Sequence, residues 1–236
     1  MAYINFKNVV LEYPIYNAKS MSLRNQLVNF TTGGVLANET SDVLTVRALD
    51  KVSFDLKDGD RVGLVGHNGA GKTTLLRTMA GIFHPISGEV KSEGRISSII
   101  ELGGGLDNEL SGYENIIRMG MMLGGTKLEM ETSLPDIEEF TDLGNFLSVP
   151  VRTYSAGMLM RLMFAVGTSI RPEILLVDEM FGAGDASFRD KAESRMKRLI
   201  GDAKIFVFAS HSDELIEKYC HKIFVLEHGK VTERKI

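Results

Sequence analysis

Gly66-His67-Asn68-Gly69-Ala70-Gly71-Lys72-Thr73 fits the pattern G-x-x-x-x-G-K-[ST]. The apolar residues 62–65 before it predict a buried strand, and residues 74–80 after it predict a helix that Gly81 closes. The glycines of such a loop let consecutive backbone N–H groups surround phosphate oxygens at the start of the helix. The order of strand, glycine-rich loop and helix therefore favours a phosphate-binding loop over a chance glycine-rich turn.

The residues of this loop have distinct expected roles toward a nucleoside triphosphate. Lys72 would place its positive charge beside the β- and γ-phosphate oxygens, and Thr73 would offer its hydroxyl to Mg²⁺. A nucleoside triphosphate and Mg²⁺ are the expected ligands. The other loop residues that we expect to contact the nucleotide are His67, Asn68, Gly69, Ala70, Gly71 and Thr74.

A second apolar run, residues 174–177, ends in the two acids Asp178 and Glu179. It is typical of a buried parallel strand, and the carboxyl ends of such strands carry the active-site residues of open α/β sheets. We expect Asp178 to hold Mg²⁺ through its water shell. Glu179 is expected to polarise the water that attacks the γ-phosphate, as general base or as water-positioner. The alternative, a solvated acidic loop, fits the preceding aliphatic residues less well.

A third apolar run, residues 203–210, places His211 at its carboxyl end. The strand would bring this histidine to the sheet edge that carries Asp178 and Glu179, where it could contact the γ-phosphate. The alternative is an ordinary surface or core histidine.

Residues 154–158, Y-S-A-G-M, precede a helix-forming run at 159–166, and Ser155 suits the N-cap of that helix. A helix start is an anion site, although a Ser-x-Gly turn before a helix is common. Because this segment lies between the phosphate-binding loop and the Asp178 strand, it resembles the signature loop of the ATP-binding cassette (ABC) ATPases. The usual form of that loop is LSGGQ, and this chain keeps its serine and one glycine, Ser155 and Gly157.

The resemblance implies how the nucleotide site is completed. In ABC ATPases the signature loop of one subunit closes over the ATP held by the phosphate-binding loop of another, so a head-to-tail homodimer with Ser155 and Gly157 acting in trans is expected. Residues 182–185 occupy the place of the D-loop, and Asp185 is its matching residue. Tyr13, just after an expected first strand at 4–10, matches the aromatic that stacks on adenine, with Tyr16 as a competing choice.

The resemblance also implies the fold class and the subdomains. The fold is α/β: a P-loop NTPase core of mixed and parallel sheet flanked by helices, with an antiparallel β part and a helical subdomain. The whole chain, 1–236, would be one nucleotide-binding domain, with a catalytic core at 1–104 and 166–236 and the helical subdomain with the signature loop at 105–165. The last strand is expected at 222–226, so no C-terminal carbohydrate-binding domain is expected.

Two further motifs resemble one subgroup of the family, the exporters of bacterial polysaccharides such as O-antigen, capsule and teichoic acid. They are E-L-G-G-G at 101–105 and E-L-S-G-Y-E-N at 109–115. Glu101 stands where most members place a glutamine that reports the γ-phosphate to the membrane partner, so it is expected to act at the nucleotide in coupling. The implied protein is a peripheral ATPase on the cytoplasmic face of the inner membrane. It would drive an integral membrane permease and act on a lipid-linked polysaccharide indirectly.

Composition agrees with this reading. The formal net charge of −4 gives no basic footprint, so a nucleic-acid partner is not expected. No apolar run approaches the roughly 18 residues of a membrane-spanning helix. The single cysteine, Cys220, excludes an internal disulfide and fits a reducing cytosol.

Three other functions are compatible with a phosphate-binding loop. A soluble ABC ATPase in nucleic-acid or translation work would be expected to carry a second cassette, a coiled-coil arm or a basic stretch, and a GTPase-like switch would need N-K-x-D; we find none of these. A cassette for a different transported substrate stays open.

Two segments have no assigned role. Residues 17–30 place apolar residues at roughly helical spacing inside an insertion at 17–45, which is either a specialised loop near the transporter's substrate entrance or a plain surface excursion. The methionines of the expected helical subdomain fit helix core packing and a partner-binding surface about equally; they are Met119, Met121, Met122 and Met130.

Overall fold

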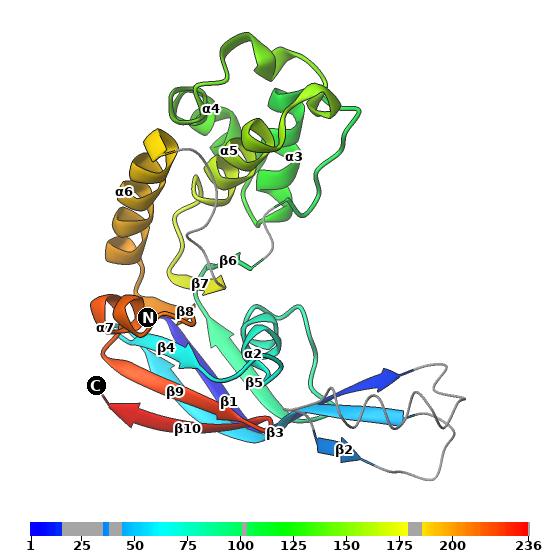
Figure 1. The fold of residues 1–236 in the computed structure, drawn as a ribbon, viewed down its shortest axis with the longest axis vertical. Coiled ribbons are helices and arrows are strands. Elements are labelled where there is room, and N and C mark those ends of the chain that lie inside the picture. The colour runs from blue at the N-terminus through cyan, green and yellow to red at the C-terminus, as the bar shows by residue number, and fades with distance from the viewer. Residues whose placement is uncertain (16–34, 38–43, 101–102, 179–185, 236) are drawn as a thin grey trace. The chain divides into compact units, whose positions relative to one another are not determined.

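The computed structural model of the chain describes residues 1–15, 35–37, 44–100, 103–178 and 186–235 (Figure 1). Its contacts divide the chain into two units. The first comprises Met1–Gly94, Val177–Glu179 and Lys204–Ile236, and the second comprises Arg95–Leu176 and Met180–Ala203. The expected subdomain boundaries at 104/105 and 165/166 follow the family resemblance, and they stay predictions.

The first unit contains an antiparallel sheet with the strand order β2-β3-β1-β5. The strands are β1 (Tyr3–Ile15), β2 (Val35–Ala37), β3 (Leu44–Lys57) and β5 (Ser87–Glu93). At the start of β1, buried Ile4 and Phe6 alternate with more exposed neighbours, as expected for a strand with one covered face. The pairing of β1 with β3 then shifts register near Asn8, whose φ is 49°.

This irregularity corrects one sequence prediction. The first strand was expected at 4–10 with Tyr13 just after it, but β1 continues to Ile15 and Tyr13 lies within it, opposite Val46. The consecutive apolar residues Val9, Val10 and Leu11 interrupt the alternation of a regular strand. Register shifts of the bulge type absorb that interruption without ending the strand.

The second sheet of the first unit is mixed, with strands in the order β10-β9-β4-β8. Strand β4 pairs in parallel with β8 and β9, and β10 pairs antiparallel with β9. The bounds are β4 (Arg61–Val65), β8 (Ile205–Ala209), β9 (Lys222–Glu227) and β10 (Lys230–Lys235). The prediction that 222–226 forms the last strand was wrong. Strand β10, K-V-T-E-R-K, lies at the sheet edge, and such a polar edge strand gives only a weak apolar signal.

Aromatic side chains connect the two sheets of the first unit. The ring of Phe54 on β3 stacks on Phe6 at 4.5 Å and lies 4.9 Å from Phe224 on β9. Phe6 and Phe224 are fully buried, so the rings form the core between the sheets.

Two helices flank the mixed sheet, α2 (Lys72–Met79) and α7 (Asp213–Tyr219). Gly63 of β4 lets α7 approach closely, because a Cβ at this position would lie 2.6 Å from a methyl carbon of Ile216. Together the two sheets and these helices place the start of α2 and the carboxyl ends of β4 and β8 in one region of the first unit (Figure 1).

The second unit is mainly helical. It contains α3 (Gly112–Met122), α4 (Lys127–Thr141), α5 (Ala156–Gly167) and α6 (Ala186–Asp202), with short 3₁₀ turns η1 (Gly144–Ser148) and η2 (Val151–Thr153). Strand β6 (Ile96–Ile99) pairs with β7 (Ile174–Asp178), whose last residues, Val177 and Asp178, belong to the first unit. Capping boxes start α3 at Ser111 and α4 at Thr126, which explains why these helices begin there.

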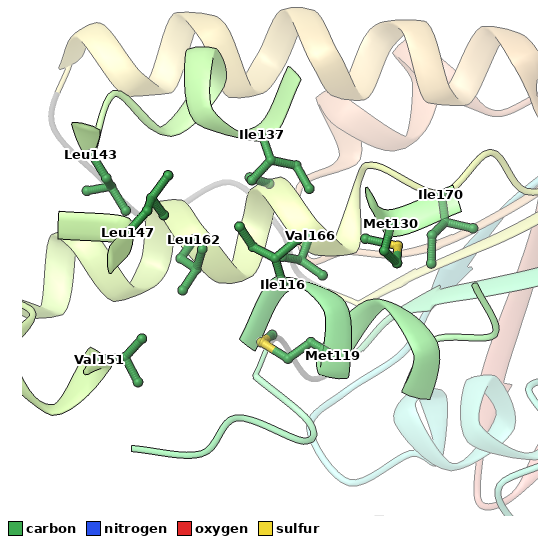
Figure 2. Packing of buried hydrophobic residues seen from close by; sticks show 11 residues of the cluster. Ile116, Met119, Met130, Ile137, Leu143, Leu147, Val151, Leu162, Val166 and Ile170 are labelled. Atoms are coloured by element: carbon green, nitrogen blue, oxygen red, sulfur yellow. The ribbon is translucent and has the colours of Figure 1, made fainter. Parts of the chain in front are cut away.

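The core of the second unit lies between α3, α4 and α5, whose apolar side chains turn toward one another (Figure 2). Its fully buried members include Ile116, Met119, Met130, Ile137, Leu147, Leu162, Ala165 and Val166. Of the methionines whose role the sequence left open, Met119 and Met130 are core residues. Met121 and Met122 are exposed, and a partner-binding role for them stays a prediction. Within the described part of the chain, no helix has the length and apolar character needed to cross a membrane.

Candidate functional site

The predicted phosphate-binding loop joins β4 to α2 in the first unit. Helix α2 begins at Lys72, and its N-cap residue, Gly71, has a φ of 105° and no side chain that could cap the helix. A Cβ on Gly71 would lie 2.9 Å from the carbonyl oxygen of Ala48, so only glycine fits both this backbone angle and this contact. The first amides of a helix have no intrahelical acceptor, which makes a helix start suited to bind an anion.

Lys72 is buried and its ammonium group is held by the loop itself. Lys72 Nζ donates hydrogen bonds to the carbonyl oxygens of Gly66, at 2.7 Å, and His67, at 3.3 Å. The charge is therefore fixed inside the curve of the loop, where the sequence predicted a phosphate contact. A charge-assisted hydrogen bond from an ammonium group is stronger than a neutral one.

Thr73 and Asp178 meet although they lie on different elements. Thr73 Oγ1, in the first turn of α2, donates to Asp178 Oδ2, at the end of β7, over 2.6 Å. A hydroxyl oxygen and a carboxylate oxygen are the hard donors that Mg²⁺ prefers, and Mg²⁺ in nucleotide sites commonly uses few protein ligands together with substrate phosphates. The pair fits such an ion. Among the residues that the structure describes, no group of three His, Cys, Asp or Glu side chains could hold a metal.

Tyr13 lies next to the same helix. Its hydroxyl donates to Thr74 Oγ1 at 3.2 Å, and its ring makes an edge-to-face contact with Phe83 at 5.6 Å between centroids. The competing residue, Tyr16, lies outside the described residues. Phe83 was not singled out from the sequence, since an aromatic residue shortly after a helix end carries no distinctive signal.

His211 follows β8 and is exposed. Strand β8 runs parallel to β4 with Ala209 opposite Leu64, so the residues after both strands leave from the same edge of the sheet. His211 is thereby placed at the edge from which the phosphate-binding loop starts. Three other predicted site residues, Glu101, Glu179 and Asp185, lie outside the described residues.

Ser155 and Gly157 belong to the second unit. Ser155 is the N-cap of α5, as predicted, and its Oγ accepts a hydrogen bond from the Met158 amide at 3.3 Å. Both residues line a cavity of about 300 Å³ together with Phe146, Met158 and Arg161.

The residue before Ser155 supports one wall of this cavity. Tyr154 donates a 2.6 Å hydrogen bond to the carbonyl oxygen of Phe146, and the two rings meet edge to face at 6.4 Å. Burial raises the pKa of Tyr154, so its hydroxyl keeps the proton that it donates. The sequence marked position 154 only as a departure from the usual signature, and its link to the turn at 144–148 required the structure.

A family profile described as "ABC transporter" matches residues 49–182, a range that includes most of β3, the phosphate-binding loop, the signature segment and β7 with Asp178 at its end. The chain belongs to the ABC transporter family. The predicted resemblance and the predicted ATPase activity are thereby confirmed, and ATP is the nucleotide of this family.

Two curated relatives are both named as ATP-binding proteins of O-antigen export systems. The chain is 59% identical over 236 residues to the O-antigen export system ATP-binding protein RfbE of Yersinia enterocolitica, covering 100% of this chain and 99% of that protein. It is 34% identical over 230 residues to the O-antigen export system ATP-binding protein RfbB of Klebsiella pneumoniae, covering 98% of this chain and 92% of that protein.

A solved structure confirms the fold class. The dimeric post-hydrolysis structure of the ATP-binding cassette MJ0796, bound to ADP and Pi, superposes with a TM-score of 0.67 at 20% identity and covers 98% of both chains. At this identity the similarity establishes the architecture of an ABC ATPase, with mixed sheet, antiparallel sheet and helices as predicted.

Proposed function

We propose that this chain is the ATP-hydrolysing subunit of a transporter that exports a lipid-linked polysaccharide such as O-antigen. The observation that carries the proposal is the 59% identity, over essentially the full length of both chains, to a protein named for O-antigen export. The motifs at 101–105 and 109–115, which resemble the polysaccharide exporters, support the same substrate class.

The first unit would bind the nucleotide. The first amides of α2 and the ammonium of Lys72 would neutralise the phosphates, with the loop residues His67, Asn68, Gly69, Ala70, Gly71 and Thr74 around them. Thr73 and Asp178 would hold Mg²⁺, which when bound adds positive charge against the β- and γ-phosphate oxygens. The ring of Tyr13 would stack on adenine.

Hydrolysis requires a positioned water and stabilised charge at the γ-phosphate. Glu179 would polarise the attacking water, and His211 would donate to a γ-phosphate oxygen from the same sheet edge. Ser155 and Gly157 would complete the site from a second copy of the chain, with Asp185 at the dimer axis. The resulting homodimer would hold two composite sites.

The energy would be passed to an integral membrane permease, with Glu101 coupling the γ-phosphate to that partner. The subunit would lie on the cytoplasmic face of the inner membrane as a peripheral protein. The net charge of −4 disfavours the alternative of work on nucleic acid, which relies on a basic surface.

Deletion of the gene in its native host tests the substrate class. The deletion strain should lose the surface polysaccharide and accumulate its lipid-linked precursor inside the cell. The wild-type gene and a Lys91→Ala variant, which removes an exposed lysine on β5, should restore export, whereas Lys72→Ala should not. If the deletion leaves the surface polysaccharide unchanged, the chain serves a different substrate and the export proposal is wrong, although the ATPase assignment stands.

A further inference from the structure

We propose that Phe83 is a positioning residue for adenine recognition, acting by fixing the ring of Tyr13. The proposal rests on the proposed role of Tyr13 as the stacking residue. It assigns a function to a side chain that lies outside the phosphate-binding loop.

The turn after α2 determines where Phe83 lies. The Gly81 amide donates to the Thr78 carbonyl at 3.1 Å, and the Ile82 amide donates to the Arg77 carbonyl at 2.9 Å. These two bonds, with a φ of 74° at Gly81, form a Schellman motif, which reverses the chain at the end of a helix. The Phe83 amide also donates to Arg77 O, at 3.3 Å. The backbone of Phe83 is therefore tied to the last turn of α2.

The side chain of Phe83 sits between two partners. The guanidinium carbon of Arg77 lies 5.6 Å from the Phe83 ring centroid, and the Tyr13 ring lies 5.6 Å from it at an interplanar angle of 81°. Two neighbouring apolar side chains face solvent instead: Ile82 is 55% exposed and Ile86 is 62% exposed. Phe83 is thus the apolar residue of this segment that is directed to Tyr13.

Two contacts on different atoms hold the Tyr13 ring. Its hydroxyl end is bound by Thr74 Oγ1 and its ring is bound by Phe83, and both partners belong to α2 or the turn that follows it. Among the ring contacts of the described residues, Tyr13 makes this one with Phe83, and an edge-to-face contact occupies at most one face of the Tyr13 ring. A ring that is already oriented loses less conformational freedom when the base stacks on it.

The expected loss of ATP affinity can be estimated from the free energies that aromatic pairs contribute in proteins. Such pairs contribute about 0.5–1.5 kcal/mol beyond area burial, which corresponds to a change in affinity of about two- to tenfold. Phe83→Ala should therefore weaken ATP binding by about two- to tenfold. It should not change the affinity for inorganic triphosphate, which has no base, or lower kcat at saturating ATP.

The experiment is a double-mutant cycle by calorimetry. ATP and inorganic triphosphate are titrated into wild type, Phe83→Ala, Tyr13→Ala and the double variant. If Phe83 acts through Tyr13, the double variant should bind ATP no more weakly than Tyr13→Ala alone. Phe83→Tyr should restore ATP affinity and Phe83→Leu should not, because only tyrosine retains an aromatic ring. Phe54→Leu, which disturbs an aromatic contact elsewhere in the same unit, should lower thermal stability and leave ATP affinity unchanged.

The outcomes separate the two claims. If Tyr13→Ala weakens ATP binding and Phe83→Ala does not, the positioning role is wrong and the stacking role stands. If the two losses add in the double variant, Phe83 does not act through Tyr13 and the inference is overturned. If Tyr13→Ala leaves ATP affinity unchanged, the proposed adenine contact itself fails. Equal losses for ATP and inorganic triphosphate would indicate damage to the phosphate-binding loop and would also contradict the inference.

Discussion

The Thr73 hydroxyl donates a 2.6 Å hydrogen bond to Asp178, a residue 105 positions away in the chain. The bond joins the first turn of α2 to the end of β7 and brings together the two side chains that are expected to hold Mg²⁺.

Removal of either partner should weaken the response to Mg²⁺. Thr73→Val keeps the shape of the side chain and removes the hydroxyl, and Asp178→Asn removes the charge. Loss of a group that orients or supports a bound metal typically costs about 10–100-fold in metal affinity. Each variant should therefore need about 10–100-fold more Mg²⁺ for half-maximal ATPase activity. An unchanged Mg²⁺ dependence in both folded variants would rule out the metal role of the pair.

Lys72→Ala should weaken ATP binding by about 10–100-fold, since a hydrogen bond to a charged group is worth about 1.5–3 kcal/mol. Calorimetry measures the affinity, and Lys91→Ala serves as the control because it removes an exposed lysine of β5. Wild-type affinity in Lys72→Ala would show that the loop does not use this charge on the phosphates.

Tyr154→Phe removes the hydrogen bond to Phe146 and retains the ring. The free energy of unfolding should fall by about 0.5–1.5 kcal/mol, and kcat should fall several-fold because the wall beside Ser155 loosens. ATP affinity should not change, since Tyr154 is not placed at the phosphate-binding loop. Tyr3→Phe, at an exposed position on β1, is the control. If Tyr154→Phe and wild type have equal kcat and equal stability, the Tyr154 hydroxyl does not support the cavity wall beside Ser155.

The start of α4 gives a prediction for acid pH. Hydrogen bonds from Arg95, and then from Thr126, lower the pKa of Glu129 from 4.5 to about 2. A carboxylate with a lowered pKa in the folded protein stabilises it fully above the unfolded value, and that stabilisation is lost as the pH falls from about 4.5 to about 2. Thermal unfolding of wild type should therefore depend more steeply on pH in this window than that of Arg95→Met. Coincident pH profiles would exclude a contribution from the Arg95–Glu129 pair.

The local motifs of the site were readable from the sequence because each is a short segment with its own signal. The strand, the glycine loop and α2 follow one another directly, and Ser155 caps α5 as its residue type suggests. Features that depend on distant residues were not readable. The continuation of β1 past Val10 depends on pairing with β3, and β10 depends on β9 as its neighbour.

In the candidate site, the sequence predicted individual residues but not the contacts between elements that lie far apart in the chain. Thr73 and Asp178 were expected to share a ligand, but their direct hydrogen bond emerges only when α2 and β7 meet. The contact of Phe83 with Tyr13 depends on the turn at Gly81 and on the β1 bulges together. The roles of Glu101, Glu179 and Asp185 stay predictions, since these residues lie outside the described part of the chain.

We propose that this ATPase works as a head-to-tail dimer, with Ser155 of one copy closing over the nucleotide held by the other. The direct test is a disulfide cross-link between Ser155→Cys and Asn68→Cys. Cys220 is replaced so that no other thiol competes, and Glu179→Gln slows hydrolysis so that the ATP-bound state accumulates. We expect a covalent dimer that forms with MgATP and is absent without it. A bond formed only within single chains, at dilutions where dimers dissociate, would contradict the head-to-tail site.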